Sequence, residues 1–293
     1  MREHLIQLLW QELGKEGFTA FVCPNSRGCF DVVARREFLL LIKVLQNIDA
    51  FTGTQADDLK NISSMLSAKA YLIGEQTKEF ILDHGVMYER HGVPASNLQT
   101  FRDIIFEKRF PERRKFRRLS VCIDPQKLIT RRNELKLSLE CLSTRAGITK
   151  KTLYRYEHGS TLASEENLKR LENVLETNLK KGMDPFSKIH PGNTFDFHGF
   201  DAIETKSAPF QVLGKERKDD DKVLLGKEAD RRIMLKRAET YRWISNIVES
   251  YSCFIVRSSA KDSIAGISIV RKDELQGLKK ARELIKLIEE RAE

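Results

Sequence analysis

The hydrophobic pattern of the sequence changes twice along the chain, and this constrains the fold more than any other feature. Residues 126–181 show no strand pattern and are predicted to form several short helices. The blocks before and after them alternate helix and strand patterns. The predicted fold is therefore α/β plus all-α, with two α/β domains flanking a central helical domain.

The first block has the element order α-β-β-β-α-β-β-α, which is typical of an α/β domain. The helical spacing of Leu5, Ile6, Leu9 and Leu13 indicates its opening helix. The other elements are predicted as strands at Phe18–Val22, Phe30–Ala34, Phe38–Leu45, Ala70–Gly74 and Val86–Arg90, and as helices near Ala56–Leu66 and Ser96–Glu107.

The last block repeats part of this order. Strands are predicted at Pro209–Leu213, Lys222–Gly226, Ser252–Val256 and Ile264–Val270, with a helix over Glu228–Glu249 and another from Lys272. Both blocks thus contain strand, strand, long helix, strand, strand, helix, and we hypothesise that the last is a degenerate repeat of the first. Arg90 and Arg271 each precede an isoleucine, Ile104 and Ile285, by 14 residues. Different strand orders in the two sheets would remove this hypothesis.

These changes of pattern set the expected domain boundaries. The first α/β domain is expected over residues 1–109, a basic linker over 110–123, the helical domain over 124–184 and the second α/β domain over 185–293. The linker contains FPERRKFRR, in which a proline precedes a dense run of basic residues. This composition is typical of an exposed connection.

The positive charge is concentrated in the centre of the chain. Residues 108–184 carry 19 basic and 10 acidic side chains, whereas the net charge is −3 over residues 1–107 and +3 over 185–293. A basic block of this kind is what nucleic-acid contact requires, because lysine and arginine neutralise phosphates and release counterions. A solvated helical surface explains the charge equally well, so the choice depends on motifs.

Other classes of protein are not indicated. The most apolar stretch, Phe38–Leu45, is interrupted by Lys43 and is far shorter than the roughly 18 residues that a membrane helix needs. The five cysteines form no CxxC pair, and the six histidines never occur at metal-ligand spacing. HExxH, GxSxG, P-loop and Rossmann motifs are absent from the sequence. We therefore expect a cytoplasmic protein with no membrane contact, no metal and no cofactor.

The central block carries a two-helix motif with a tight turn. Ser138 suits the N-cap of a short helix containing Leu142, and Ala146-Gly147 suits its end, because glycine tolerates the left-handed conformation there. Ile148 follows as a core residue, and Thr149 suits the cap of a second helix that Gly159 ends. Two such helices form a helix-turn-helix, whose second helix enters the major groove of DNA.

This motif resembles the lambda Cro/repressor type of helix-turn-helix. The pattern S-x-x-x-L-x-x-x-A-G-[IV]-[ST]-x-x-x-[LI]-x-x-x-E-x-G is filled completely, although Lys136 stands where that family often has glycine. Lys150 and Lys151 lie in the first turn of the second helix, where the helix dipole disfavours cations, so an incoming phosphate would relieve the cost. The resemblance implies DNA contact by Ser138, Thr149, Lys150, Lys151, Thr152, Tyr154 and Arg155.

Other residues of the basic block have different expected roles. The resemblance implies that Arg132 and Glu157 form a partly buried ion pair that positions the second helix and does not contact bases. The basic run in the linker is a candidate arm for the DNA backbone or minor groove, with a solvated linker as the alternative. That arm consists of Arg113, Arg114, Lys115, Arg117 and Arg118.

The N-terminal element order resembles the restriction-endonuclease-like fold, which includes archaeal Holliday-junction resolvases. In that fold a helix Glu, a strand Asp and a Glu-x-Lys hold Mg²⁺, and Glu12, Asp31 and Lys43 fall at suitable places. The position two before Lys43 is Leu41, so one hard oxygen ligand is missing from the metal site. We expect a degenerate scaffold without catalytic activity.

As a whole, the chain resembles the archaeal family of HTH-type transcriptional regulatory proteins. The resemblance implies a sequence-specific regulator that binds double-stranded DNA, and the two-fold symmetry of most such sites favours a homodimer. A resolvase-like nuclease targeted by its helix-turn-helix is the first alternative, and a basic module that binds an acidic protein is the second. The sequence specifies neither the operator nor the effector.

Overall fold

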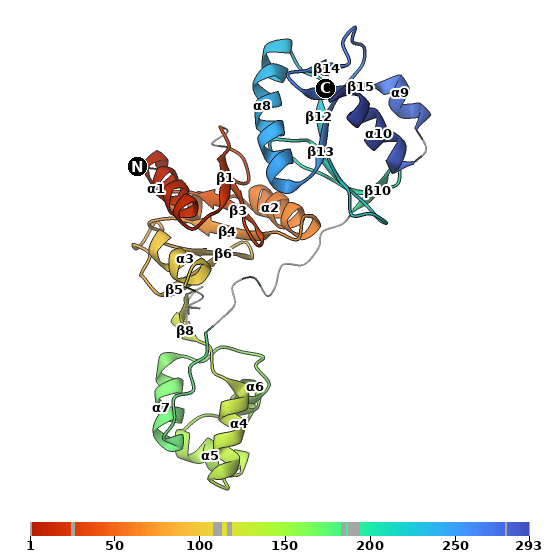
Figure 1. The fold of residues 1–293 in the computed structure, drawn as a ribbon. Helices are drawn as coiled ribbons and strands as arrows, with labels where there is room; N and C mark the ends of the chain where they lie inside the picture. Colours follow the sequence, from red (N-terminus) through yellow and green to blue (C-terminus); the bar gives the residue numbers. More distant parts are fainter. Residues whose placement is uncertain are drawn as a thin grey trace. The chain divides into compact units, whose positions relative to one another are not determined.

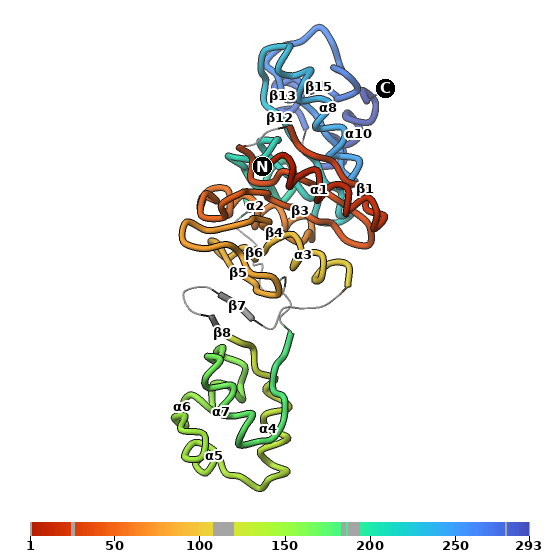
Figure 2. The backbone as a smooth tube through the Cα atoms, turned by 90° about the vertical axis from the view of Figure 1, so that its left-hand side faces the viewer, coloured from red at the N-terminus to blue at the C-terminus, as the bar shows by residue number. Residues whose placement is uncertain are grey.

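The computed structural model describes residues 2–24, 27–107, 113–115, 119–182, 186, 194–278 and 280–292. The chain forms two compact units. One comprises Met1–Ile73, Arg90–Val93 and Lys188–Glu293, and the other comprises Gly74–Glu89 and Pro94–Ser187. Figures 1 and 2 show two sheet-containing regions and one region built from α4, α5, α6 and α7.

The first sheet has eight strands in the order β1-β2-β3-β4-β6-β5-β7-β8. Strands β1, β2 and β3 are antiparallel neighbours, and β4 pairs with β3 in parallel after helix α2. Leu9 and Leu13 of helix α1 are fully buried. The elements are α1 (Arg2–Lys15), β1 (Thr19–Val22), β2 (Val32–Arg35), β3 (Leu39–Val44), η1 (Ile48–Ala50), α2 (Gly53–Met65), β4 (Lys69–Ile73), β5 (Val86–Arg90), β6 (Val93–Ser96), α3 (Leu98–Ile105), β7 (Arg113–Lys115) and β8 (Leu119–Val121).

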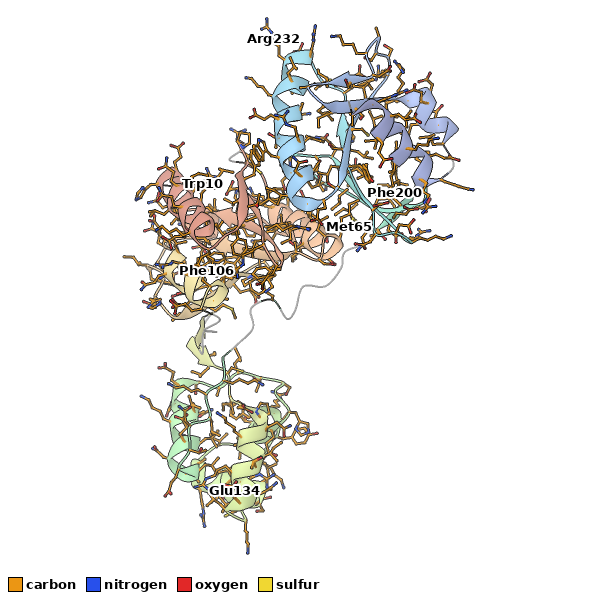
Figure 3. The ribbon with its side chains drawn as sticks, in the orientation of Figure 1. Trp10, Met65, Phe106, Glu134, Phe200 and Arg232 are labelled. Atoms are coloured by element: carbon orange, nitrogen blue, oxygen red, sulfur yellow. The ribbon has the colours of Figure 1, made fainter. Side chains whose placement is uncertain are left out.

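The second sheet has seven strands in the order β14-β15-β13-β12-β11-β10-β9. Helices α8 and α10 lie on either side of its central strands (Figure 1), and the exposed Arg232 belongs to the first turn of α8 (Figure 3). The elements are β9 (Phe195–Phe197), β10 (Phe200–Glu204), β11 (Val212–Glu216), β12 (Lys222–Lys227), α8 (Arg231–Val248), β13 (Tyr251–Val256), β14 (Ser263–Ile264), β15 (Ile267–Arg271), α9 (Lys272–Gly277) and α10 (Ala281–Arg291).

The predicted fold class is confirmed, but several strands differ from the prediction. Strand β6 was not predicted, and its second residue is Pro94, which has no N–H to donate and is uncommon within a sheet. Strands β9 and β10 were also missed, and the strand expected at Pro209–Leu213 begins only at Val212. The predicted strand Ile264–Val270 is two strands, because Ala265 and Gly266 turn the chain with φ angles of 50° and 76°.

The two sheets share one strand order over six strands. The order β1-β2-β3-β4-β6-β5 in the first corresponds to β10-β11-β12-β13-β15-β14 in the second. In both, the central parallel pair is joined through a long helix, and the last hairpin has a two-residue turn with positive φ angles, at His91-Gly92 and Ala265-Gly266. Arg90 ends β5 and Arg271 ends β15, however, so the spacing match between these two arginines does not relate equivalent positions.

The central helices enclose a core of their own. They are α4 (Pro125–Glu134), α5 (Leu139–Ala146), α6 (Lys150–Glu157) and α7 (Glu165–Leu175), and Glu134 at the end of α4 is labelled in Figure 3. Leu128 is fully buried, whereas Leu135, the residue that caps the end of α4, is 39% exposed. Leu137 enters the core in its place, because Lys136 adopts a φ of 52° and redirects the chain after α4.

Two short strands occupy part of the segment expected to be a linker. β7 pairs with β5 in parallel and with β8 in antiparallel orientation. Val121 of β8 exchanges two backbone hydrogen bonds with Ala163, of 2.8 and 2.9 Å, and belongs to the core of the helical domain. Strand β8 is therefore part of the helical domain as well as of the first sheet.

Replacing Lys136 by glycine should stabilise the helical domain. A non-glycine residue with a φ of 52° is strained, and relief of about 1–2 kcal/mol exceeds the entropy cost of about 0.5–1 kcal/mol that glycine adds to the unfolded chain. We expect Lys136→Gly to raise the free energy of unfolding by about 0.5–1 kcal/mol in denaturant titrations. Lys136→Ala is the control, because it removes the same side chain and keeps the strain. Equal effects of the two substitutions would contradict this explanation.

Candidate nucleic-acid interface

The turn between α5 and α6 is built by three local interactions. Ser138 caps α5 by accepting a hydrogen bond of 3.0 Å from the Cys141 amide. Gly147 ends α5 with a φ of 63°, and Thr149 caps α6 by accepting a bond of 3.2 Å from the Thr152 amide. The two hydroxyls therefore satisfy amides that the helix starts leave free, and glycine permits the left-handed turn between them.

Helix α6 has one buried face and one exposed face. Leu153 and Tyr156 are buried, at 0% and 3% exposure, and pack in a core that includes Leu142 and Ile148. The opposite face presents its side chains to solvent. These exposed residues are Lys150, Lys151, Tyr154 and Arg155.

The two lysines of the first turn differ in their partners. Lys150 forms an ion pair with Glu140 of α5 at 2.7 Å, and the hydrogen bond from Lys150 lowers the pKa of Glu140. Lys150 therefore has a local partner that offsets the cost of a cation at the start of α6. Within the described part of the chain, neither Lys151 nor Arg155 forms an ion pair. Their cationic groups are available to an anionic ligand.

Tyr154 stands beside these cations on the exposed face. Its ring is stacked on the imidazole of His158, and the ring centroids are 4.0 Å apart. Tyr154 as a residue is 55% exposed. His158 Nδ1 also lies 2.8 Å from the Tyr154 carbonyl oxygen. The stack holds an aromatic surface at the outer face of α6.

Arg132 of α4 and Glu157 of α6 form the ion pair that was expected between these helices. The Arg132 Nε donates to Glu157 at 2.6 Å, and its Nη1 donates to the Leu137 carbonyl at 2.9 Å. Their side chains are only 16% and 8% exposed. One guanidinium therefore joins the start of the motif, the loop before α5 and the last residue of α6.

The candidate DNA arm is described only in its backbone course. Arg113–Lys115 form β7, whereas Arg117 and Arg118 lie outside the described residues.

The first α/β domain brings together two of the three residues expected from a nuclease-like centre. Asp31 and Lys43 are both fully buried, with Lys43 Nζ 3.1 Å from Asp31 Oδ1. Arg2 Nη2 donates to the same oxygen at 2.6 Å, and the amide of Val44 donates to Oδ2 at 2.8 Å. Both carboxylate oxygens are thus bonded to protein donors.

Burial dominates the ionisation of this pair. It raises the pKa of the Asp31 carboxyl, against the attraction of Lys43, and it lowers the pKa of the Lys43 amine. Leu41, at the position of the missing carboxylate, is 1% exposed, and Glu12 forms an ion pair with Lys15 at 2.9 Å. Among the described residues no group of three His, Cys, Asp or Glu side chains is placed to hold a metal ion. The arrangement is that of a closed structural contact.

The chain matches known proteins over almost its whole length. Residues 2–111 match a PD-(D/E)XK superfamily domain and residues 128–181 match a helix-turn-helix family. It is 34% identical to a "Putative HTH-type transcriptional regulatory protein" of Methanothermobacter thermautotrophicus, over 99% of this chain and 97% of the relative. A second "Putative HTH-type transcriptional regulatory protein", from Pyrococcus horikoshii, is 33% identical, over 98% of this chain and 97% of the relative.

The chain belongs to this archaeal family of HTH-type transcriptional regulatory proteins. Its central domain is a helix-turn-helix of the Cro/repressor type, and its N-terminal domain belongs to the PD-(D/E)XK superfamily. None of the helices in the described ranges is long and apolar enough to cross a membrane.

Two residues that matter in this member of the HTH-type regulatory family were not found from its sequence. Glu140 forms an ion pair with Lys150, which lies ten residues further along the chain. The two side chains meet because the chain turns at Gly147 between α5 and α6. Arg2 lies 29 residues before Asp31, so no local spacing marks their contact. Both depend on tertiary geometry.

Removing the Arg132 guanidinium should destabilise the helical domain. Arg132→Ala leaves the mostly buried Glu157 carboxylate and the Leu137 carbonyl without this donor, at a cost of about 1–3 kcal/mol in chemical unfolding. Arg145→Ala removes an exposed charge from the last turn of α5 and is the matched control. Equal stability of the two variants would show that the pair does not hold α6 in place.

Proposed function

We propose that this protein is a sequence-specific transcriptional regulator that reads the major groove of DNA with α6. The observation that carries the proposal is the exposed cationic face of a helix whose other face is fixed in the core. A helix with this geometry at the second position of a helix-turn-helix fits the groove width and offers donors to base edges.

Apart from Lys150, which pairs with Glu140, each exposed residue of α6 has a role in this proposal. Arg155 is suited to a bidentate contact with guanine, and Lys151 to a guanine edge or a phosphate. Ser138 and Thr149 lie at helix N-termini that can contact the backbone, together with Thr152. Tyr154 offers a ring edge and hydroxyl beside Arg155, and Arg113, Arg114, Lys115, Arg117 and Arg118 extend the backbone contact as an arm.

The proposed oligomeric state and cellular location follow from recognition of DNA through the major groove. Two copies bound to half-sites related by two-fold symmetry double the contact area and lengthen the recognised sequence, so we propose a homodimer. A protein of this function works in the cytoplasm with its double-stranded DNA.

The N-terminal domain is proposed to act as a scaffold without nuclease activity, because Asp31 is fully buried with both oxygens bonded to protein donors and Leu41 replaces a ligand. The match to the PD-(D/E)XK superfamily makes a nuclease targeted by its helix-turn-helix the second candidate. Cleavage of duplex or branched DNA that requires Mg²⁺ and is lost in Asp31→Ala would favour that candidate.

Substitutions on the exposed face should reduce sequence preference. Sites are first selected from random duplex DNA with the full chain, and binding to the selected site and to a scrambled site is then compared. Lys151→Ala and Arg155→Ala should each reduce the difference in binding free energy between the selected and the scrambled site by about 1–3 kcal/mol if they contact bases. Lys169→Ala, an exposed cation of α7, is the matched control and should leave the difference unchanged. No selected site, or equal losses in all three variants, would contradict the proposal.

Releasing Lys150 from its partner should strengthen DNA binding. Glu140→Gln removes the carboxylate that holds Lys150 at 2.7 Å, so its ammonium can contact a phosphate. The slope of log affinity against log salt should become steeper by about 0.9, the value for one phosphate contact. Glu166→Gln removes a carboxylate paired with Arg170 within α7 and is the control for net charge. The same change of slope in both variants would exclude a specific effect of Lys150.

A further inference from the structure

The position of Asp31 in the first domain can be defined by its backbone bonds. The Asp31 amide donates to the Ile42 carbonyl at 2.8 Å, immediately before the paired strands β2 and β3. Its side chain accepts from the Val44 amide at 2.8 Å, two residues further along β3. The Asp31 carbonyl accepts from the Cys23 amide at 2.8 Å, which closes the loop between β1 and β2.

Gln211 makes the same set of bonds in the second domain. Its amide donates to the Leu225 carbonyl at 3.0 Å, and its Oε1 accepts from the Lys227 amide at 2.8 Å. The Gln211 carbonyl accepts from the Thr205 amide at 2.8 Å, closing the loop between β10 and β11. With the shared strand order, these bonds make Gln211 the counterpart of Asp31.

The same register makes Gly226 the counterpart of Lys43. Lys43 pairs with Leu72 between β3 and β4, and Gly226 pairs with Phe254 between β12 and β13. A Cβ atom on Gly226 would lie 2.5 Å from Phe254 Cδ1 and 2.8 Å from the Tyr241 hydroxyl, so the aromatic rings fill the place of a side chain. The second domain has therefore lost both charges of the buried pair.

A cavity of about 520 Å³ lies at this position in the second domain. Its wall includes Gln211 and Gly226, together with the apolar residues Val212, Leu225 and Ile255 and the ring of Phe197. Its volume is within the range of about 300–1,000 Å³ that is usual for small-molecule sites. Unlike the closed Asp31–Lys43 contact, this place is open to a ligand.

The charged residues of the cavity wall are mostly cationic. The cavity wall contains three cationic residues, Lys227, Arg257 and Lys272, and one carboxylate, that of Glu228. Glu228 accepts a bond of 3.0 Å from the Arg257 amide, and Lys227 pairs with Glu204 at 3.0 Å. The side chains of Arg257 and Lys272 form no ion pair with a described residue, and both residues are exposed. Two cations are thus available beside an apolar wall with an aromatic ring.

We propose that this cavity binds a nucleotide, with its phosphate on Arg257 and Lys272 and its base against the apolar wall at Phe197. Guanidinium and ammonium groups bind phosphate through charge-assisted hydrogen bonds, and every base has a face that can stack on an aromatic ring. At the position that corresponds to Asp31, the second domain has the uncharged Gln211. It therefore lacks the negative charge that would repel a phosphate bound without a metal ion. The nucleotide is either free or the terminal unit of a nucleic-acid strand.

The proposal is tested by calorimetric titration of the full chain with dAMP, and with deoxyadenosine and inorganic phosphate as separate probes. We expect dAMP to bind more tightly than either part alone. The double variant Arg257→Ala/Lys272→Ala should weaken dAMP binding by about tenfold or more. Arg232→Ala/Lys286→Ala removes two exposed cations elsewhere in the same domain and should bind dAMP like the parent chain.

A second titration distinguishes the two sources of the nucleotide. A single-stranded tetranucleotide with a 5′-phosphate should displace dAMP if the cavity holds a strand end, and should fail to displace it if the ligand is a free nucleotide. Because α6 lies in another domain, Lys151→Ala should leave dAMP binding unchanged, which separates this result from the test of DNA reading. Absence of dAMP binding, equal affinity for phosphate alone, or full binding by Arg257→Ala/Lys272→Ala would overturn the proposal.

Discussion

The attachment of α6 to the helical core is the constraint on which the proposed function depends. Leu153 and Tyr156 fix one face of α6, and the bond between Arg132 and Glu157 fixes its end against α4. Because α6 is short, its own backbone bonds would not keep it helical in water. The packing therefore provides both the helix and the direction in which its cations point.

The two α/β domains share an architecture but differ in their centres. In the first, Asp31 and Lys43 form a buried ion pair, and the partly exposed Arg2 also pairs with Asp31. In the second, Gln211 and Gly226 occupy the corresponding places, and a cavity with cations on its wall is present. A duplication followed by divergence of the two centres is our interpretation of this pattern. The two centres therefore differ in charge: the first holds a buried ion pair and the second has none.

Local chemistry was sufficient to predict the central motif. Its helix caps and its tight turn depend only on neighbours in the sequence. The structure contains the caps at Ser138 and Thr149 and the left-handed Gly147. The exposure of Leu135 was not predictable in this way, because Lys136 adopts a positive φ that its residue type disfavours. The ion pair between Lys150 and Glu140 depends on how α5 and α6 cross, which spacing alone does not give.

The fold class of the two α/β domains was predictable from the sequence, but some of their strands were not. Long apolar strands such as β3 and β13 are marked by composition, whereas β6 contains a proline and β9 is short and mostly exposed. The equivalence of the two sheets was indicated by element order, but the equivalence of Asp31 with Gln211 required the hydrogen bonds of both. The cavity beside Gln211 is formed by residues from distant parts of the second domain and has no sequence pattern.

The most direct test of the account is methylation interference on a site selected by the full chain. Methylation of guanine N7 modifies the major groove, whereas methylation of adenine N3 modifies the minor groove. If α6 reads the major groove, N7 methylation at discrete guanines should block binding, and the effect at one of them should disappear in Arg155→Ala. Interference confined to adenine N3, or none at any base, would contradict the central claim.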